Sequence, residues 1–285
     1  MKPRIVLLTQ MHQRPAISEL FCMSALRIQE ASSPKFDVTI VSLVSDTASE
    51  AVCVKYGIDM IFTCVAPLGK KMNTGMTELL EKYEFDYLLK IDDDDIGASN
   101  LLDIYAPFIK AKVHLFGVKQ VYFLDVASKR AILYKYPYSV AKLFGCGKMI
   151  SRHALEHTGW QAQFRPKSSH RVFGLDFRPT YTYLIPWYRA HYMQEMRYGE
   201  IIGAKRFALF DDDQVRSLDY RSEMNFVGNG FMPVEVDTPL PLFTDVKTSV
   251  NIWKFSDYAN TGKVVPVSQA TGHWSEQERE YLERL

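Results

Sequence analysis

The sequence has few cysteines and no long apolar run. Its four cysteines, Cys22, Cys53, Cys64 and Cys146, form no Cys-x-x-Cys pair and no cluster with histidines. This spacing argues against a disulfide scaffold and against a zinc site, so we expect free buried thiols in a reducing compartment. The apolar run nearest the amino terminus is only Ile5 to Leu8, and about 18 uninterrupted apolar residues occur nowhere. We therefore expect a cytoplasmic protein without a signal peptide or a transmembrane segment.

The net charge of +1 conceals an uneven distribution of charge along the chain. Residues 119–206 contain 15 basic and 5 acidic residues, whereas residues 1–118 contain 12 and 15, and residues 207–285 contain 7 and 13. The basic block also holds sixteen of the chain's aromatic residues. Cations bind phosphates and flat rings stack on bases or sugars, so this block predicts a polyanionic partner such as DNA. The alternative is that the aromatic residues belong to the core and the cations are solvated.

The order of predicted elements indicates an α/β fold. With 285 residues, 47% of them hydrophobic, the chain can form one large domain. Apolar strands are predicted over residues 3–9, 36–44 and 59–65, and helices over 16–30 and 48–56, with Pro15 at the start of the first helix and Gly57 at the end of the second. Alternation of this kind predicts a mostly parallel central sheet flanked by helices.

The most informative stretch is a short apolar strand at residues 87–91 that leads directly into four aspartates, Asp92 to Asp95. Four adjacent anions repel one another, so we expect a cation at this end of the strand. Carboxylate oxygens suit Mg²⁺ and Mn²⁺, and open α/β sheets bind ligands at the carboxyl ends of their strands. The alternative is a solvated acidic turn that caps the helix expected from about residue 99.

Two lysines, Lys70 and Lys71, lie at the start of a helix predicted between residues 67 and 83. The amino end of a helix favours anions, so these cations do not stabilise the helix itself. We expect them to help bind an anion, and phosphate is the natural candidate. The alternative is a solvated lysine pair.

The order of these motifs resembles the nucleotide-sugar half of family 2 glycosyltransferases with the GT-A fold. The resemblance spans roughly residues 3–180 and rests on four features: a strand followed by Arg-Pro and a helix, a strand ending in Ser-Asp, the PLGKKMNTGM helix and the DDDD strand end. It implies a donor-binding half at residues 1–118. Residues 119–285 would form the acceptor-binding half and a C-terminal lid of the same catalytic domain.

The resemblance also implies roles for individual residues of the donor site. Asp46 would contact the nucleotide base, and Thr9 would lie in the first loop of the same pocket. Asp92 and Asp94 would form the DxD pair that meets ribose and metal. The run of four aspartates leaves a second register open, in which Asp93 and Asp95 are the functional pair.

Further candidates lie downstream. Inverting enzymes of this fold carry a catalytic carboxylate at about the position of Asp176, which makes it the expected general base; a structural aspartate in a turn is the alternative. His273 is a candidate late metal ligand, and the alternative is a lone histidine without a role in metal binding. Residues 211–213 are a second acidic run, which could supply an alternative base or a second metal site or could be a solvated turn. Ser151 would cap a helix after a glycine-rich strand on the acceptor side. We expect residues 244–255 to form a lid that brings Lys247 near the diphosphate.

These expectations combine into one activity: a metal-dependent, inverting transfer of a sugar from a nucleotide-diphosphate sugar to an acceptor hydroxyl, with Mn²⁺ or Mg²⁺. The acceptor would be a hydroxymethylated pyrimidine in DNA, as in phage enzymes, or a cell-surface glycan or lipid-linked sugar. One rival is a nucleotide- or nucleic-acid-binding module without catalysis. Another is a sugar nucleotidyltransferase, which is disfavoured because the loop after the first strand lacks glycine.

Overall fold

The computed structural model describes residues 1–63, 68–136, 143–159, 164–165, 200–201, 218–249, 251 and 254–285. Three of the features predicted from sequence, Asp176, the acidic run at 211–213 and Cys64, lie outside these ranges. The other candidate ligands all lie within them. The remaining three cysteines are buried free thiols, as expected.

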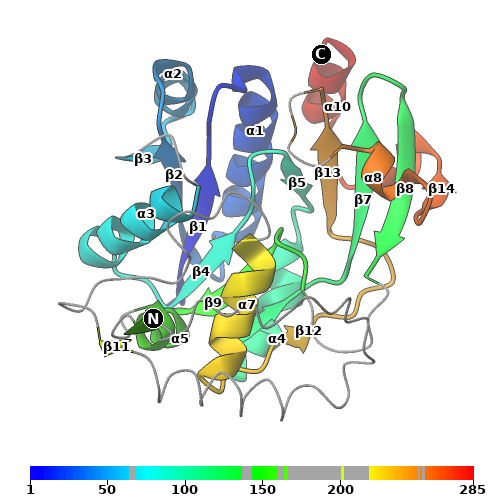
Figure 1. Ribbon diagram of the computed structural model, residues 1–285. Helices are drawn as coiled ribbons and strands as arrows, with labels where there is room; N and C mark the ends of the chain where they lie inside the picture. Colours follow the sequence, from blue (N-terminus) through cyan, green and yellow to red (C-terminus); the bar gives the residue numbers. More distant parts are fainter. Residues whose placement is uncertain are drawn as a thin grey trace.

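A seven-stranded sheet forms the centre of the molecule (Figure 1). Across the sheet its strands are β12 (Val234–Glu235), β6 (Leu115–Gly117), β9 (Lys148–Ser151), β4 (Tyr87–Lys90), β1 (Arg4–Gln10), β2 (Asp37–Val44) and β3 (Asp59–Phe62). β9 is antiparallel to its neighbours β4 and β6, whereas the other neighbouring pairs are parallel. The structure thus confirms the α/β fold with a mostly parallel central sheet.

Helices cover both faces of this sheet, and β1 shows how the sequence directs them. Ile5 and Leu7 point into one core and Val6 and Leu8 into another, because successive side chains of a strand alternate between faces. The helices of the first face are α1 (Pro15–Ser32), α2 (Thr47–Tyr56) and α4 (Leu101–Lys110), and those of the second are α3 (Leu68–Lys82), α5 (Arg152–Gly159) and α7 (Leu218–Gly228). Burial on both faces explains why β1 is a continuous apolar run.

The ends of α2 follow directly from the sequence. Asp46 precedes the helix and accepts a hydrogen bond from the backbone N–H of Ser49, which satisfies a free donor of the first turn. Gly57 ends it with φ of 65°, a left-handed conformation that glycine adopts without a steric penalty. Pro15 occupies the first turn of α1, as predicted.

A second sheet stands beside the first (Figure 1). Its strands, in order, are β14 (Lys263–Val265), β8 (Arg130–Lys135), β7 (Gln120–Asp125), β13 (Phe243–Lys247) and β5 (Asp95–Gly97). Short helices α8 (Ser256–Ala259) and α9 (Val267–Ala270) and the C-terminal α10 (Glu276–Glu283) accompany it, and β10 (Phe164–Arg165) pairs separately with β11 (Glu200–Ile201). One core cluster contains residues from both sides of position 118, so the two sequence halves share a core.

The segment expected to form a lid has a different structure at its start. Residues 243–247 form β13, which pairs in parallel with β7 and antiparallel with β5. Phe243 and Val246 are fully buried in this strand, so it lies inside a sheet rather than over a bound donor. The prediction of a lid was therefore wrong for these residues. The helices of the described residues include none that is long and apolar enough to cross a membrane.

Candidate active site

The carboxyl ends of β1 and β4 lie side by side in the central sheet. From β1 the chain proceeds to β2 on one side of the sheet, whereas from β4 it proceeds to β6 on the other side. The strand order therefore reverses between β1 and β4, the point at which open α/β sheets bind ligands. Gln10 ends β1 and donates a hydrogen bond from Nε2 to Oδ1 of Asp92, at 3.3 Å, across this junction.

The acidic run after β4 forms a turn, in which the N–H of Asp95 donates to the carbonyl of Asp92 at 3.0 Å. The turn sends the side chains in different directions. Asp92 pairs with Lys90 at 2.8 Å, whereas Asp93 is fully buried and accepts a hydrogen bond from Ser18 Oγ at 2.8 Å. Each aspartate thus has its own surroundings, which its position in the sequence did not reveal.

Arg14, at the amino end of α1, binds two of these carboxylates. One guanidinium nitrogen contacts Oδ1 of Asp93, and the other lies 3.2 Å from Oδ2 of Asp94. Asn251 donates to the same Oδ2 of Asp94 and itself accepts hydrogen bonds from the Thr248 backbone and hydroxyl. The Asp94 carboxylate is therefore held from both sides.

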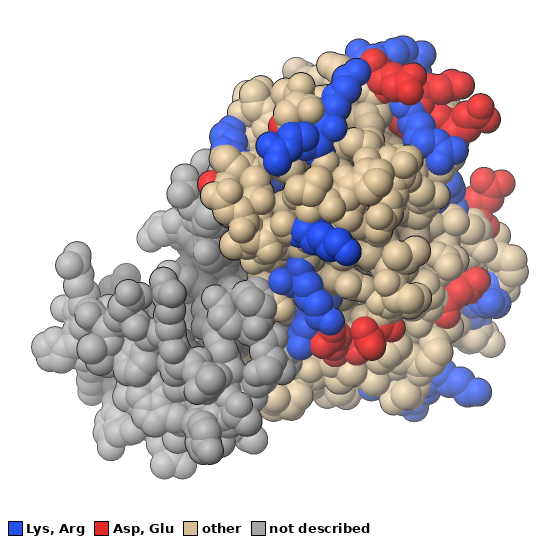
Figure 2. Space-filling model, turned by 90° about the vertical axis from the view of Figure 1, so that its right-hand side faces the viewer, with Lys and Arg blue, Asp and Glu red and all other residues tan. Residues whose placement is uncertain are grey.

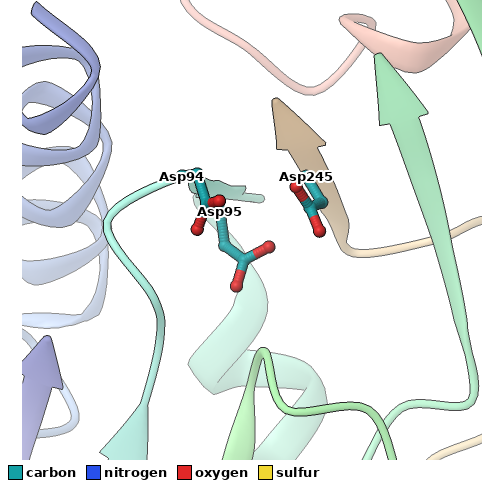
Figure 3. Close-up of side chains that lie close together, drawn as sticks. All are labelled: Asp94, Asp95 and Asp245. Atoms are coloured by element: carbon teal, nitrogen blue, oxygen red, sulfur yellow. The ribbon is translucent and has the colours of Figure 1, made fainter. Parts of the chain in front are cut away.

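Three carboxylates from two distant segments converge next to this turn. An oxygen from each of Asp94, Asp95 and Asp245 lies within 4.8 Å of the other two. Figure 3 shows Asp245, on β13, facing the two aspartates that precede and begin β5. The antiparallel pairing of β13 with β5 sets Asp245 opposite Asp95 and so creates the cluster.

The charges at this site do not balance. Among the described residues, its carboxylates are Asp92, Asp93, Asp94, Asp95 and Asp245, and its cations are Arg14, Lys90 and Lys247. Within this set, carboxylates exceed cations by two when every group is ionised. Lys247 is buried, lies 2.7 Å from Oδ2 of Asp245 and sits over the ring of Phe123. It neutralises one carboxylate from within the protein.

The protonation of the site reflects this excess. Burial raises the pKa of Asp93 and of Asp245 to about 7, and neighbouring carboxylates add to the effect while adjacent cations oppose it. Burial raises the pKa of Asp95 as well. At Asp94 burial acts in the same direction, but the attraction of Arg14 and Lys247, together with the hydrogen bonds that the carboxylate accepts, outweighs it and the pKa is lowered. A cation bound here would displace protons from the raised groups.

One atom of the cluster is left without a partner. Oδ1 of Asp245 is buried and accepts no hydrogen bond from any described residue. A buried carboxylate oxygen without a partner is costly, and a divalent cation would satisfy it. The donor set consists of carboxylate oxygens only, which suits Mg²⁺ and Mn²⁺. The residues present therefore fit such an ion.

The residues predicted to bind the donor lie at the same edge of the sheet. Thr9 is near the end of β1, and its buried Oγ1 has no hydrogen-bond partner among the described residues. Lys71 reaches across from α3 to donate to the Met11 carbonyl at 2.9 Å and to Ser45 Oγ at 3.0 Å. It therefore ties the ends of β1 and β2 together instead of lying in solvent.

Asp46 lies next to this tie, at the end of β2. Its carboxylate accepts hydrogen bonds from the backbone and hydroxyl of Ser49 and from the Gln13 backbone, and its Oδ2 is 3.1 Å from Nδ1 of His12. Burial acts to raise its pKa, but these hydrogen bonds lower it. Asp46 is thus an ionised carboxylate at the edge of the predicted donor pocket.

Two predicted metal ligands lie outside the three-carboxylate group. Asp92 is bound to Lys90 and Gln10. His273 is largely buried and lies with Nε2 3.0 Å from the carbonyl oxygen of Ile96, and burial lowers its pKa to about 4. Among the described residues the structure thus groups Asp94 with Asp95 and Asp245.

Sequence analysis missed Asp245, Arg14 and Asn251 as parts of this site. No pattern in the sequence marked Asp245, because its strand, Phe-Thr-Asp-Val-Lys, has a mixed composition. Arg14 was noted only as part of the Arg-Pro pair before the first helix, and no role was predicted for its side chain. Asn251 has its role only because residues 243–247 pair with β5.

Gly147, in the glycine-rich segment before β9, leaves room for the ring of Phe243 on β13. This residue has φ of 70°, and a Cβ built on it would lie 2.2 Å from Cε2 of Phe243. Its N–H donates to the Lys90 carbonyl at 2.8 Å. Glycine here lets β13 approach the strand that carries the aspartates. Ser151 accepts a hydrogen bond from the Ala154 backbone, which confirms its predicted capping role.

A scan of protein-family models and a search of curated proteins give no match. Among solved structures the chain is similar to glucosyl-3-phosphoglycerate synthase from Mycobacterium tuberculosis in complex with Mn²⁺, UDP and phosphoglyceric acid, at 13% identity and a TM-score of 0.39. The match covers 55% of this chain and 59% of that one. TarS from S. aureus matches at 17% identity and a TM-score of 0.37, over 59% of this chain and 52% of that one. At this similarity, function has to follow from the residues of the chain itself.

Proposed function

We propose that the protein is a metal-dependent glycosyltransferase of the GT-A type that uses a nucleotide-diphosphate sugar. The observation that carries the proposal is the convergence of Asp94, Asp95 and Asp245 beside the carboxyl end of β4. The excess of carboxylates over cations within the described part of the site, and Oδ1 of Asp245, which has no hydrogen-bond partner among those residues, favour a divalent cation there. The motif order, which resembles family 2 enzymes, supports the same activity.

Each side of the site would bind a different part of the donor. Thr9 and Asp46 would meet the nucleoside beyond the ends of β1 and β2, and Asp92 the ribose. Mn²⁺ or Mg²⁺ on the three carboxylates would neutralise the charge that develops on the leaving diphosphate. Lys71 would support this pocket by joining β1 to β2.

The acceptor side requires a group that removes a proton from the attacking hydroxyl. A sugar or hydroxymethyl hydroxyl is a poor nucleophile, and a carboxylate within hydrogen-bond reach activates it. We assign this role to Asp176, which lies outside the described residues. Attack from the face opposite the leaving diphosphate inverts the anomeric centre.

We further propose DNA that carries a hydroxymethylated pyrimidine as the acceptor. Support comes from the basic block at 119–206 and from exposed cations on and near β8 and β14: Lys129, Arg130, Lys135, Lys254 and Lys263. Figure 2 shows Lys and Arg distributed over this side of the molecule, with Asp and Glu mainly toward its edges. A cell-surface glycan or a lipid-linked sugar is the alternative acceptor.

The test of the donor site is a thermal-shift panel of UDP, GDP and their sugars, each with and without Mn²⁺. Binding to the folded state alone raises the melting temperature by mass action. We expect a Mn²⁺-dependent shift with one nucleotide. If no nucleotide produces a shift, the transferase proposal fails and a non-catalytic nucleic-acid-binding module becomes the better account.

The test of the acceptor is the salt dependence of DNA binding. Release of counterions makes the logarithm of affinity fall linearly with the logarithm of salt concentration. We expect charge-reversal variants Lys129→Glu and Arg130→Glu to lower both affinity and slope. An affinity for DNA that does not depend on salt would contradict a DNA acceptor but leave the donor site untouched.

A further inference from the structure

A cluster of three histidines and one phenylalanine lies at the end of the central sheet opposite the candidate active site. His153 and His157 are on α5, His114 immediately precedes β6, and Phe231 lies shortly before β12. Since β9 is antiparallel to β4, α5 begins at the amino ends of the parallel strands. Asp92 follows the carboxyl end of β4, so the two clusters occupy opposite edges (Figure 1).

Two pairs of imidazole rings lie close together in this cluster. The ring centroids of His114 and His153 are 5.2 Å apart, and those of His153 and His157 are 6.1 Å apart. Two imidazoles that bind one metal at about 2.1 Å from each nitrogen have centroids about 5 Å apart in a tetrahedral site. The His114–His153 pair matches this spacing. The three sets of ring nitrogens do not converge within 4.8 Å as the carboxylates do, so a shared ion requires rotation of the exposed His153 and His157 side chains.

The spacing along α5 favours the same interpretation. His153 and His157 are four positions apart in a helix, so they project from one face, as metal-binding histidine pairs on helices do. Both side chains belong to exposed residues, and no hydrogen bond occupies their ring nitrogens among the described residues. Glu156, between them, is paired with Arg152 at 2.7 Å and does not compensate the imidazoles.

Contacts with Ser151 and Phe231 hold His114 in position. Its Nδ1 is 2.9 Å from Ser151 Oγ, and when Nδ1 carries the proton, the lone pair of Nε2 is free for a metal. The ring of Phe231 stands edge-on to all three imidazoles, with centroids 5.3 to 5.8 Å away. Phe231 thus covers one side of the row, and the other side is open to solvent.

We propose that His114, His153 and His157 form a surface site for a transition-metal ion of the Zn²⁺, Cu²⁺ or Ni²⁺ class. Imidazole nitrogens suit these ions, whereas the all-carboxylate cluster on the other edge suits Mg²⁺ and Mn²⁺. The ion links α5 to the start of β6.

The test is a calorimetric titration of the full chain, without a histidine tag, with ZnCl₂ alone. It is carried out in an Asp245→Asn background, so that the carboxylate cluster does not compete for the ion. We expect the additional replacement of His153 and His157 by glutamine to weaken Zn²⁺ binding by at least about tenfold. The matched control is His12→Gln, a partly exposed histidine at the other edge, which should leave Zn²⁺ binding unchanged.

A second measurement identifies the ligands directly. Electron paramagnetic resonance of bound Cu²⁺ should show coupling to imidazole nitrogens, and the coupling should disappear in the double glutamine variant. The same variant should keep its Mn²⁺-dependent thermal shift with nucleotide, because the two sites are separate. Equal Zn²⁺ affinity with and without His153 and His157, or no Zn²⁺ binding at all, would overturn the proposal.

Discussion

Asn251 donates a hydrogen bond from Nδ2 to Oδ2 of Asp94 across 157 positions of the sequence. Arg14 binds the same oxygen from α1, so two elements remote in sequence orient one carboxylate. Asp245 then completes the cluster from β13. The site is thus assembled from the first loop, the acidic turn and the C-terminal part of the chain, and each contribution can be tested separately.

Asp245→Asn should abolish the Mn²⁺ response. The amide keeps the size of the side chain and can still accept a hydrogen bond from Lys247, but it removes one anionic ligand. We expect Mn²⁺ affinity, measured by calorimetry, to fall by at least about tenfold, and sugar transfer to fall with it. Asp37→Asn, an exposed aspartate at the far end of β2, is the matched control and should change neither.

Arg14→Ala should destabilise the protein most strongly when no divalent cation is present. The change leaves Asp93 and Asp94 without their common partner, and loss of one member of a buried ion pair costs about 3 kcal/mol or more. Urea unfolding should show that Mn²⁺ restores more stability in this variant than in the wild type.

The control for this prediction is Arg4→Ala. The Arg4 guanidinium lies 3.8 Å from the exposed Glu84 and Asp86, so removing this side chain should cost less than about 1 kcal/mol. Equal losses for the two arginine variants would mean that the Arg14 contacts contribute no more than a surface pair.

Lys148 and Glu223 form a buried ion pair at 3.3 Å that joins β9 to α7, and Glu223 also accepts a hydrogen bond from the Leu143 backbone. Lys148→Met should cost about 3 kcal/mol because a buried carboxylate loses a cation. Adding Glu223→Gln removes that charge but keeps an acceptor for Leu143. Urea unfolding of both single variants and the double variant should therefore show the double variant to be more stable than Lys148→Met alone. Additive losses would contradict the pairing.

His273 should make folding stability depend on pH below neutrality. Burial lowers its pKa to about 4 in the folded state, from an ordinary value near 6.5. The folded state therefore binds the proton less well than the unfolded chain. The contribution of His273 to the free energy of unfolding is complete above about pH 6.5. It is lost progressively as the pH falls to about 4, by up to about 3 kcal/mol.

The measurement is a series of melting temperatures between pH 7.5 and 4. His273→Gln should flatten the curve in this window, because glutamine does not titrate. The exposed His157→Gln is the matched control and should leave the slope unchanged. A wild-type slope that survives in the His273 variant would place the titrating group elsewhere.

Local sequence patterns predicted much of the framework. The apolar strands that became β1, β2 and β4 were recognisable because burial on both faces demands continuous apolar runs. Helix ends were marked by Pro15 and Gly57, whose backbone preferences are intrinsic. The position of the acidic run directly after β4 was also predicted correctly, because the apolar strand that precedes it was recognisable. Residues 243–247 were misjudged as a lid because a strand covered on both faces shows no alternation.

The sequence by itself determined the class of fold and the presence of an acidic cluster at the end of a central strand, since both depend on neighbouring residues along the chain. Only the tertiary structure decided which carboxylates share a site. Asp245 joins Asp94 and Asp95 because β13 pairs with β5, and His114 meets His153 because β9 pairs with β6. Strand pairing over such separations is set by the packing of the whole core, and no local pattern encodes it.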